Sequence, residues 1–201
     1  MRTYQGSGTF SELVEAAQDQ EDGEIVCAIN GDFWNYLAFE RVIVRNGEVL
    51  SELEYISRRD YCVITEDGTM HTYPASIKDP NDLVKCWQLF CFGPELVHNY
   101  KPVLDYSNCF DYDVAGNSHP RTAIGYYEKN HFCFLLVYGR NEEDHGCYLE
   151  EMAQFFADLG CKYAYNLDGG SSSHVWYDGK EQGKPDGDKP LSDIIYIRRD
   201  S

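Results

Sequence analysis

The sequence predicts an α+β fold: a mixed, mostly antiparallel sheet built from hairpins, one long helix at about residues 148–159, and a few short helices. Three observations support this prediction. Apolar and β-branched runs outnumber helical patterns along the chain. Some of these runs are joined by short turns such as Asn46-Gly47 and Asp67-Gly68, which are typical of hairpins. The later part of the chain alternates strand, helix and strand around one long amphipathic segment.

Helix signals are few. Thr9-Phe10-Ser11-Glu12 is a capping box, which predicts a short helix that ends near Gln18. Asp79-Pro80 supplies an N-cap and an N1 proline for a turn of helix shortly afterwards. The strongest signal runs from Tyr148 to Leu159, and Gly160 is suited to end that helix as its C′ residue. The apolar stripe of this helix consists of Leu149, Met152, Ala153, Phe155, Phe156 and Leu159.

Strand signals extend over most of the chain. The predicted strands are 24–29, 39–44 with 48–50, 61–65 with 69–73, 122–127 with 131–138, 163–167 and 193–197. Asn46-Gly47 predicts a type I′ turn in the first hairpin. The polar segment 178–189 is predicted to be an exposed loop or hairpin arm, because a strand-like run follows it. No repeat or clear linker divides the sequence, so we expect a single domain over 1–201, which can be a piece excised from a longer chain.

The charge of the chain limits its partners. Its formal net charge is −17, and such a surface repels nucleic acid and anionic membranes. No apolar run approaches the roughly 20 residues that span a bilayer, so no membrane insertion is expected in this segment. The N-terminal residues also lack the apolar region of a signal peptide. An anionic substrate would need a few arginines gathered in a cleft, which makes each arginine in a motif informative.

The chain has eight cysteines, without a Cys-x-x-Cys pair or a zinc-binding spacing. Four of them, at positions 27, 62, 91 and 133, lie within apolar strand-like runs. Buried free thiols are the simplest interpretation. Disulfides formed in an oxidising compartment are a second interpretation, and a cysteine nucleophile is the least supported because no base accompanies any of them in sequence.

Polar clusters follow or open several predicted strands, where side chains can converge on a cleft while the sheet fixes their positions. The first cluster, Asn30 to Trp34, joins a polar turn to two aromatic residues that suit sugar rings, although Asn-Gly-Asp also favours a plain turn. In the second, His119 to Gly125, a proline places Arg121 at the start of a strand. The third is Tyr138-Gly139-Arg140, where another arginine follows an apolar strand. Either arginine could be an ordinary surface residue, but the long loop before Arg121 favours a function.

The fourth and most specific cluster is Asn166 to Ser173, with the sequence Asn-Leu-Asp-Gly-Gly-Ser-Ser-Ser. Asn166 and Asp168 share one face of the strand, opposite Leu167. Two glycines then allow a tight turn and offer bare N–H groups. A serine-rich turn without function is the alternative. The segment lacks the Gly-x-Ser-x-Gly pattern of a nucleophile elbow and the lysine of a phosphate-binding loop.

Together, the four clusters resemble the phosphodiester glycosidase family. The family pattern is Asn-Gly-x-Phe after a strand, then Pro-Arg-Thr-Ala-x-Gly, then Gly-Arg before a long helix, then Asn-Leu-Asp-Gly-Gly-Gly-Ser. This sequence matches in order at 30–33, 120–125, 139–140 and 166–171. It departs from the pattern at Ser171, which replaces the third glycine, and little precedes the first motif where family members usually carry strands. The resemblance extends from about residue 10 to the C-terminus.

The resemblance implies hydrolysis of a sugar-1-phosphodiester at the glycosidic C–O bond, with release of a free sugar and a phosphomonoester. A departing phosphate is already a good leaving group, so the second carboxylic acid of ordinary glycosidases is less necessary. We expect Asp168 to act as nucleophile or base, Arg121 and Arg140 to bind the phosphate, and Asp32 to be the second carboxylate. The expected substrate-binding residues are Asn30, Gly31, His119, Thr122, Arg140, Asn166, Gly169, Gly170, Ser171 and Ser172. Asn30 and Asn166 are expected to bind sugar hydroxyls or to orient the carboxylate, and His119 to act as an acid or a phosphate ligand. Of these, Gly169 and Gly170 are expected to offer their amides to the anion.

No metal or other cofactor is expected, although Asp32 and Asp168 could share a divalent cation. The expected partner is a small-molecule or glycan phosphodiester, and bacterial relatives imply substrates in envelope or host glycans. Family analogy favours an extracytoplasmic or cell-surface location. Three other functions stay open: a module that binds sugar phosphates without turnover, a phosphodiesterase that cuts the P–O bond, and a structural domain of a surface protein. The enzyme hypothesis predicts that Asp168, Arg121, Arg140 and Asn30 converge on one pocket.

Overall fold

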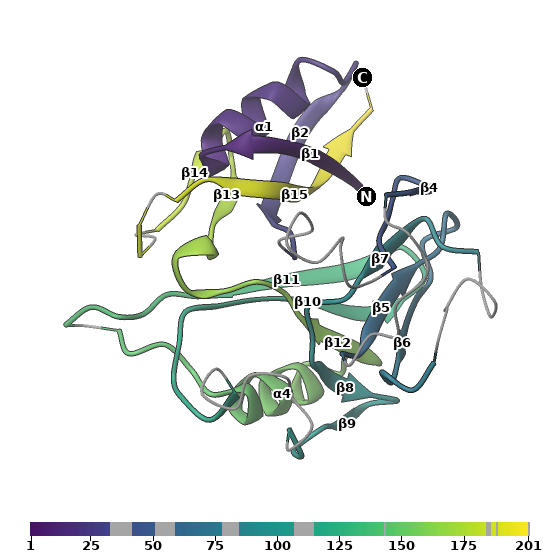
Figure 1. The fold of residues 1–201 in the computed structure, drawn as a ribbon, viewed down its shortest axis with the longest axis vertical. Coiled ribbons are helices and arrows are strands. Elements are labelled where there is room, and N and C mark those ends of the chain that lie inside the picture. Colours follow the sequence, from purple (N-terminus) through teal and green to yellow (C-terminus); the bar gives the residue numbers. More distant parts are fainter. Residues whose placement is uncertain are drawn as a thin grey trace.

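The computed structural model describes residues 1–32, 42–50, 59–77, 85–106, 115–142, 144–183, 186–187 and 189–200. These residues form three five-stranded sheets, and every strand pair in them is antiparallel. Figure 1 shows the sheets together with the two α-helices of this part of the chain. None of the helices in the described ranges has the length and apolar character needed to cross a membrane.

The first sheet, here called the terminal sheet, contains both ends of the described chain (Figure 1). Its strands, in spatial order, are β1 (Arg2–Gly8), β15 (Leu191–Arg199), β2 (Glu24–Asn30), β13 (Val175–Tyr177) and β14 (Lys180–Glu181). Helix α1 (Phe10–Gln18) buries Phe10, Leu13, Val14 and Ala17 against it. The predicted capping box of this helix is confirmed, with reciprocal bonds between Thr9 and Glu12.

The second sheet, here called the central sheet, carries the other helix. Its strands, in spatial order, are β11 (His131–Val137), β10 (Arg121–Glu128), β12 (Tyr163–Asn166), β8 (Glu95–His98) and β9 (Lys101–Pro102). Helix α4 (Leu149–Asp158) packs on this sheet, and Gly160, which follows the C-cap residue Leu159, has a φ of 81° that suits the predicted C′ position. Phe155 and Leu159, expected within the apolar stripe, are instead exposed.

The third sheet, here called the hairpin sheet, contains the turn of the first predicted hairpin and the whole of the second; residues 39–41 of the first lie outside the described residues. Its strands, in spatial order, are β4 (Glu48–Val49), β3 (Val44–Arg45), β7 (Gln88–Phe90), β5 (Tyr61–Ile64) and β6 (Met70–Tyr73). Asn46 and Gly47 both have positive φ, at 50° and 81°, as the predicted type I′ turn requires. The hairpin of β5 with β6 is also confirmed.

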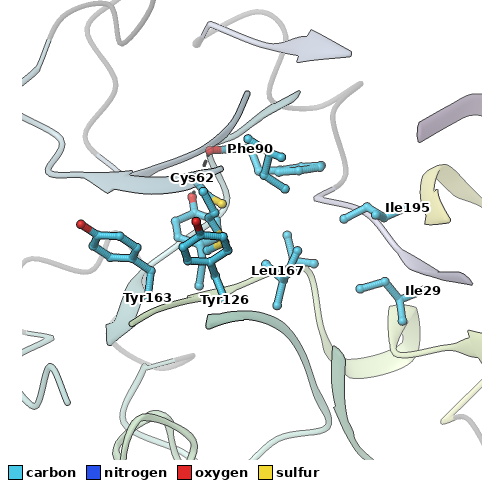
Figure 2. Packing of buried hydrophobic residues seen from close by; sticks show 11 residues of the cluster. Ile29, Cys62, Phe90, Tyr126, Tyr163, Leu167 and Ile195 are labelled. Atoms are coloured by element: carbon cyan, nitrogen blue, oxygen red, sulfur yellow. Dashed lines mark hydrogen bonds between the residues drawn. The ribbon is translucent and has the colours of Figure 1, made fainter. Parts of the chain in front are cut away.

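The three sheets meet in one hydrophobic core, shown in Figure 2. The terminal sheet contributes Ile29 and Ile195, the hairpin sheet Cys62 and Phe90, and the central sheet Tyr126 and Tyr163. Leu167 enters the same core directly after β12. Burial of a Leu side chain of this kind contributes about 1.5–3 kcal/mol. The core therefore anchors the chain one residue before Asp168.

The predicted α+β class, with a mixed sheet and one long helix, is wrong. Of the described residues, 43% are in strands and only 14% in helices, and α4 has ten residues. β11 and β12, which come before and after α4 along the chain, do not form the parallel pair that a mixed sheet would contain. Instead, β10 lies between them and pairs antiparallel with each. The sequence pattern gave their order along the chain, but not the neighbour that separates them.

Several short strands have too weak a pattern to be predicted. β1 contains Gly6 and Gly8 and exposes polar side chains, so its strand state depends on pairing with β15. β7, β8 and β13 have only three or four residues each. The polar segment predicted as a loop or arm begins with the β13–β14 hairpin, whose turn residues Asp178 and Gly179 have positive φ. The helical turn predicted after Asp79-Pro80 lies outside the described residues.

A buried group of three charges joins the terminal sheet to the hairpin sheet. The Arg45 guanidinium of β3 bonds to the carboxylates of Asp32, which follows β2, and Asp193 in β15. It also lies 4.4 Å from the centre of the Phe90 ring. Burial raises the pKa of Asp193 to about 6, although Arg45 acts to lower it. We call Arg45, Asp32 and Asp193 the charge triad.

We expect the Arg45→Met substitution to lower the free energy of unfolding by about 3–5 kcal/mol at pH 7, because it leaves two buried carboxylates without a counter-charge. Chemical denaturation measures this loss. The difference from wild type should shrink as the pH falls towards 5, because Asp193, whose pKa burial raises to about 6, takes up a proton and loses its charge.

The matched control is Arg199→Met, which removes an arginine from an exposed pair with Glu24. It should change stability by no more than about 0.5 kcal/mol. Equal effects of the two substitutions would show that the charge triad does not hold the sheets together.

Candidate active site

The candidate active site lies where the ends of neighbouring strands in the central sheet meet. β10 begins at Arg121, which pairs with Val137 at the end of β11. Two residues later, Ala123 pairs with Asn166 at the end of β12. Because antiparallel neighbours run in opposite directions, the start of one strand lies beside the ends of those next to it. The segments that follow β11 and β12 therefore emerge next to Arg121.

A pocket of about 120 Å³ opens at this edge of the sheet. It brings together three charged side chains that the sequence singled out, Arg121, Arg140 and Asp168. Its lining consists of Phe92, His119, Pro120, Arg121, Arg140, Leu167, Asp168, Gly169 and Gly170. The other expected site residues, Asn30, Gly31, Asp32, Thr122, Asn166, Ser171 and Ser172, are not part of this lining.

Arg121 is held in place by backbone carbonyl groups. Its side chain is almost fully buried, with the residue 2% exposed. Its Nε donates to the Cys147 carbonyl at 3.3 Å, and its Nη2 donates to the Asn117 carbonyl at 2.9 Å. These bonds fix the guanidinium in the pocket wall before any ligand arrives. A fixed cation of this kind stabilises an anion without the cost of reorganisation.

Arg140 also lines the pocket, and it is more exposed than Arg121. Its Nη2 lies 3.0 Å from His119 Nδ1, and its Nη1 lies 3.0 Å from Asp186 Oδ2. Since a guanidinium can only donate, this contact requires His119 to accept through an unprotonated Nδ1. A Cβ built on Gly170 would lie 3.2 Å from Nη1, so the missing side chain lets the guanidinium lie against the loop. Arg140 itself has a φ of 61°, an uncommon conformation that places its side chain here.

Asp168 is the carboxylate of the pocket. Its Oδ1 accepts from its neighbour's amide, Gly169 N, at 2.8 Å, and its Oδ2 lies 3.8 Å from Lys189 Nζ. Burial raises the pKa of Asp168 above its ordinary value, while the Ser172 hydroxyl, Lys189 and the Gly169 amide act to lower it. The group therefore combines a desolvated, more basic carboxylate with nearby positive charge, which suits a nucleophile or a general base.

Asn30 is not part of the pocket lining, but its side chain bonds to the segments that are. Its Nδ2 donates to the Asp168 carbonyl at 2.7 Å and to the Gly31 carbonyl at 3.2 Å. Its Oδ1 accepts from Thr122 Oγ1 at 2.8 Å and from the His174 amide at 3.2 Å. These four bonds use the full capacity of a side-chain amide. Asn30 and Thr122 therefore position the loop that carries Asp168, and neither points a free polar group at a substrate.

Asp32, expected as the second carboxylate, belongs to the charge triad. Its Oδ1 bonds to Arg45, its Oδ2 accepts from the Cys91 amide at 2.9 Å, and the residue is fully buried. Gly31 is equally confined, because an added Cβ would lie 2.2 Å from Asp193 Oδ2. Among the described residues, no group of three or more His, Cys, Asp and Glu side chains could hold a metal ion.

The two glycines after Asp168 act differently from the expectation. The Gly169 amide bonds to Asp168 itself, and the Gly170 amide donates to the Pro120 carbonyl at 2.8 Å. The structure therefore gives both amides protein partners instead of leaving them for an anion. Their lack of a side chain matters more, since a Cβ at Gly169 would lie 2.7 Å from the Pro120 oxygen.

The remaining expected residues lie in or next to this loop. Asn166 is buried, and its Nδ2 donates to the Gly93 carbonyl at 2.8 Å. Ser172 is buried and Ser171 is partly buried, both in the short 3-10 helix η2 (Gly170–Ser172). The bond from Asn166 indicates that this residue stabilises the loop.

Three further residues at the site were missed by the sequence analysis. His174 is buried, stacks on the Phe10 ring with centroids 5.2 Å apart, and bonds through Nδ1 to Glu181. Asp186 and Lys189 come from the polar segment that was predicted only as a loop or arm. No local motif identifies either of them, because their contacts with Arg140 and Asp168 join residues 46 and 21 positions apart.

Comparisons with known proteins give the site its context. A model of the phosphodiester glycosidase family matches residues 23–198. The SPbeta prophage-derived uncharacterized protein YomE of Bacillus subtilis (strain 168) is 31% identical over 170 residues, which is 77% of this chain and 24% of that protein. The chain therefore spans about a quarter of the length of this curated relative.

Two solved structures share the fold. The catalytic domain of zebrafish N-acetylglucosamine-1-phosphodiester alpha-N-acetylglucosaminidase, auto-inhibited by its pro-peptide, superimposes with a TM-score of 0.73 at 18% identity and covers 96% of this chain and 68% of that one. A hypothetical protein from Synechocystis superimposes with a TM-score of 0.64 at 16% identity, over 98% of this chain and 56% of that one. The family match includes all four clusters that line or support the pocket, and the chain belongs to the phosphodiester glycosidase family.

Proposed function

We propose that this protein hydrolyses a glycosyl-1-phosphodiester at the glycosidic C–O bond and releases a free sugar and a phosphomonoester. The observation that carries the proposal is the placement of Arg121, Arg140 and Asp168 around one small pocket. The net charge of −17 disfavours anions elsewhere on the surface, so two arginines in one pocket mark the place where a phosphate is bound most favourably.

The chemistry assigns one role to each of these groups. The two guanidinium groups bind the phosphate and stabilise the negative charge that collects on it as the C–O bond breaks. The Asp168 carboxylate either attacks the anomeric carbon or removes a proton from the attacking water. No carboxylic acid has to protonate the leaving group, because a phosphomonoester anion leaves readily. This agrees with the enclosure of Asp32 in the charge triad, and we give Asp32 no part in proton transfer.

Two alternatives use the same residues. A phosphodiesterase that cuts the P–O bond would need the arginines and a nucleophile aimed at phosphorus. A binding module would need the arginines but no ionised carboxylate beside them. The raised pKa of Asp168 and its place beside Arg121 and Arg140, here called the phosphate clamp or simply the clamp, favour catalysis over binding alone. Family membership favours the glycosidase over the phosphodiesterase.

We expect Asp168→Asn to lower turnover by at least about 10²–10⁴-fold, since it removes the nucleophile or base while keeping the size of the side chain. The assay uses a panel of glycosyl-1-phosphate methyl esters that differ in the sugar, including N-acetylglucosamine. Asp178→Asn is the matched control, because it changes an exposed turn residue whose φ of 55° asparagine tolerates well. A folded Asp168→Asn variant with near-normal turnover would remove Asp168 from the mechanism.

The pH dependence tests the ionised state of Asp168. Because the carboxylate is the active form, kcat/KM should rise with pH through the pKa of Asp168, which burial places above its ordinary value. Lys189→Met removes a cation that lowers this pKa, so the acid limb of the profile should move to higher pH while the plateau rate changes little. Lys180→Met, in the exposed β14 strand, should leave the profile unchanged. An acid limb that stays in place in Lys189→Met would contradict this coupling.

A further inference from the structure

Asp186 forms an ion pair with Arg140, although Asp186 is not part of the pocket lining. Its Oδ2 lies 3.0 Å from Arg140 Nη1, and 26% of its side chain is exposed. A carboxylate and a phosphate oxygen make the same kind of charge-assisted bond with a guanidinium. Under the proposed function, the anion of the substrate and the carboxylate of Asp186 would therefore compete for, or share, the same cation.

Three described residues near Asp186 in the sequence, Gln182, Gly183 and Gly187, lie close to other parts of the chain. Tyr138 donates to the Gln182 carbonyl, and Gly183 lies so close to the Tyr138 ring that no Cβ fits there. On the other side, a Cβ at Gly187 would lie 3.6 Å from the Ser171 Cβ, next to η2. The Asp186 carboxylate itself is placed by its ion pair with Arg140. The ion pair itself is partly exposed and therefore weak enough for a ligand to displace.

The charge of the phosphate changes in the proposed reaction. A phosphodiester carries one negative charge. When the C–O bond breaks, the bridging oxygen stays on phosphorus with the bonding electron pair, and water supplies the hydroxyl group of the free sugar. The remaining proton goes to solvent above about pH 6, the usual second pKa of a phosphomonoester, so the product carries nearly two charges.

We propose that Asp186 is a specificity-determining residue that makes the clamp accept singly charged phosphodiesters and disfavour doubly charged phosphomonoesters. This rests on the proposed function. A carboxylate at the rim of the clamp repels a dianion about twice as strongly as a monoanion at the same distance. Asp186 thereby favours release of the product and keeps free phosphomonoesters from occupying the site.

The test compares two small ligands, dimethyl phosphate and methyl phosphate, which differ by about one charge at pH 8. Their dissociation constants are measured by calorimetry on the wild-type chain and on Asp186→Asn. The substitution should strengthen binding of methyl phosphate by about tenfold and that of dimethyl phosphate by about threefold or less. Asp22→Asn removes the same charge from an exposed position before β2, whose far end reaches the site, and should change neither constant.

Equal strengthening of both ligands, or no change in either, would overturn the role of Asp186 while leaving the phosphate clamp intact. Loss of binding in the Arg140→Gln variant would show that both ligands bind at the clamp. Failure of both ligands to bind the wild-type chain would overturn this inference together with the clamp. Binding with the expected ratio, but without turnover of any glycosyl phosphodiester, would keep the role of Asp186 and refute only the proposed hydrolysis.

Discussion

The side-chain amide of Asn30 is the interaction on which the geometry of the site depends. It bonds at once to the Asp168 carbonyl, the Thr122 hydroxyl and the His174 amide, which belong to different segments of the chain. Each of these groups is buried or partly buried, and a buried polar group left without a partner costs about 1–3 kcal/mol. One residue at the end of β2 therefore sets where the carboxylate of the pocket lies relative to β10, the strand that carries Arg121.

The two residues that follow Asn30 are held by close packing and by an ion pair. Asp193 lies so close to Gly31 that only glycine fits, and its backbone carbonyl accepts from the Gly31 amide at 3.0 Å. Asp32 then pairs with Arg45 in the hairpin sheet. Three adjacent residues thus serve three purposes: Asn30 bonds to the loop that carries Asp168, Gly31 allows close packing, and Asp32 completes the charge triad. This arrangement explains why a motif that resembles a substrate-binding turn contributes no described side chain to the pocket.

The sequence predicted three charged residues that line the pocket, but not the contacts that hold the residues around them. Arg121, Arg140 and Asp168 were identified because each follows or begins a strong strand pattern, and antiparallel pairing brings those ends together. Asp32 was misjudged because a buried ion pair with Arg45 leaves no local signal. Asp186 and Lys189 were missed because their contacts with Arg140 and Asp168 also join residues far apart in the sequence. The mixed sheet was wrong because periodicity identifies strands but not their neighbours, and β10 separates β11 from β12.

The central claim is that the bond between the sugar and the phosphate oxygen is the one that breaks. The direct measurement is turnover of a glycosyl-1-phosphate methyl ester in heavy-oxygen water, followed by mass spectrometry of both products. Attack at the anomeric carbon places the heavy oxygen in the free sugar and leaves methyl phosphate unlabelled. Heavy oxygen in the phosphate product instead would show P–O cleavage and contradict the proposed glycosidase activity.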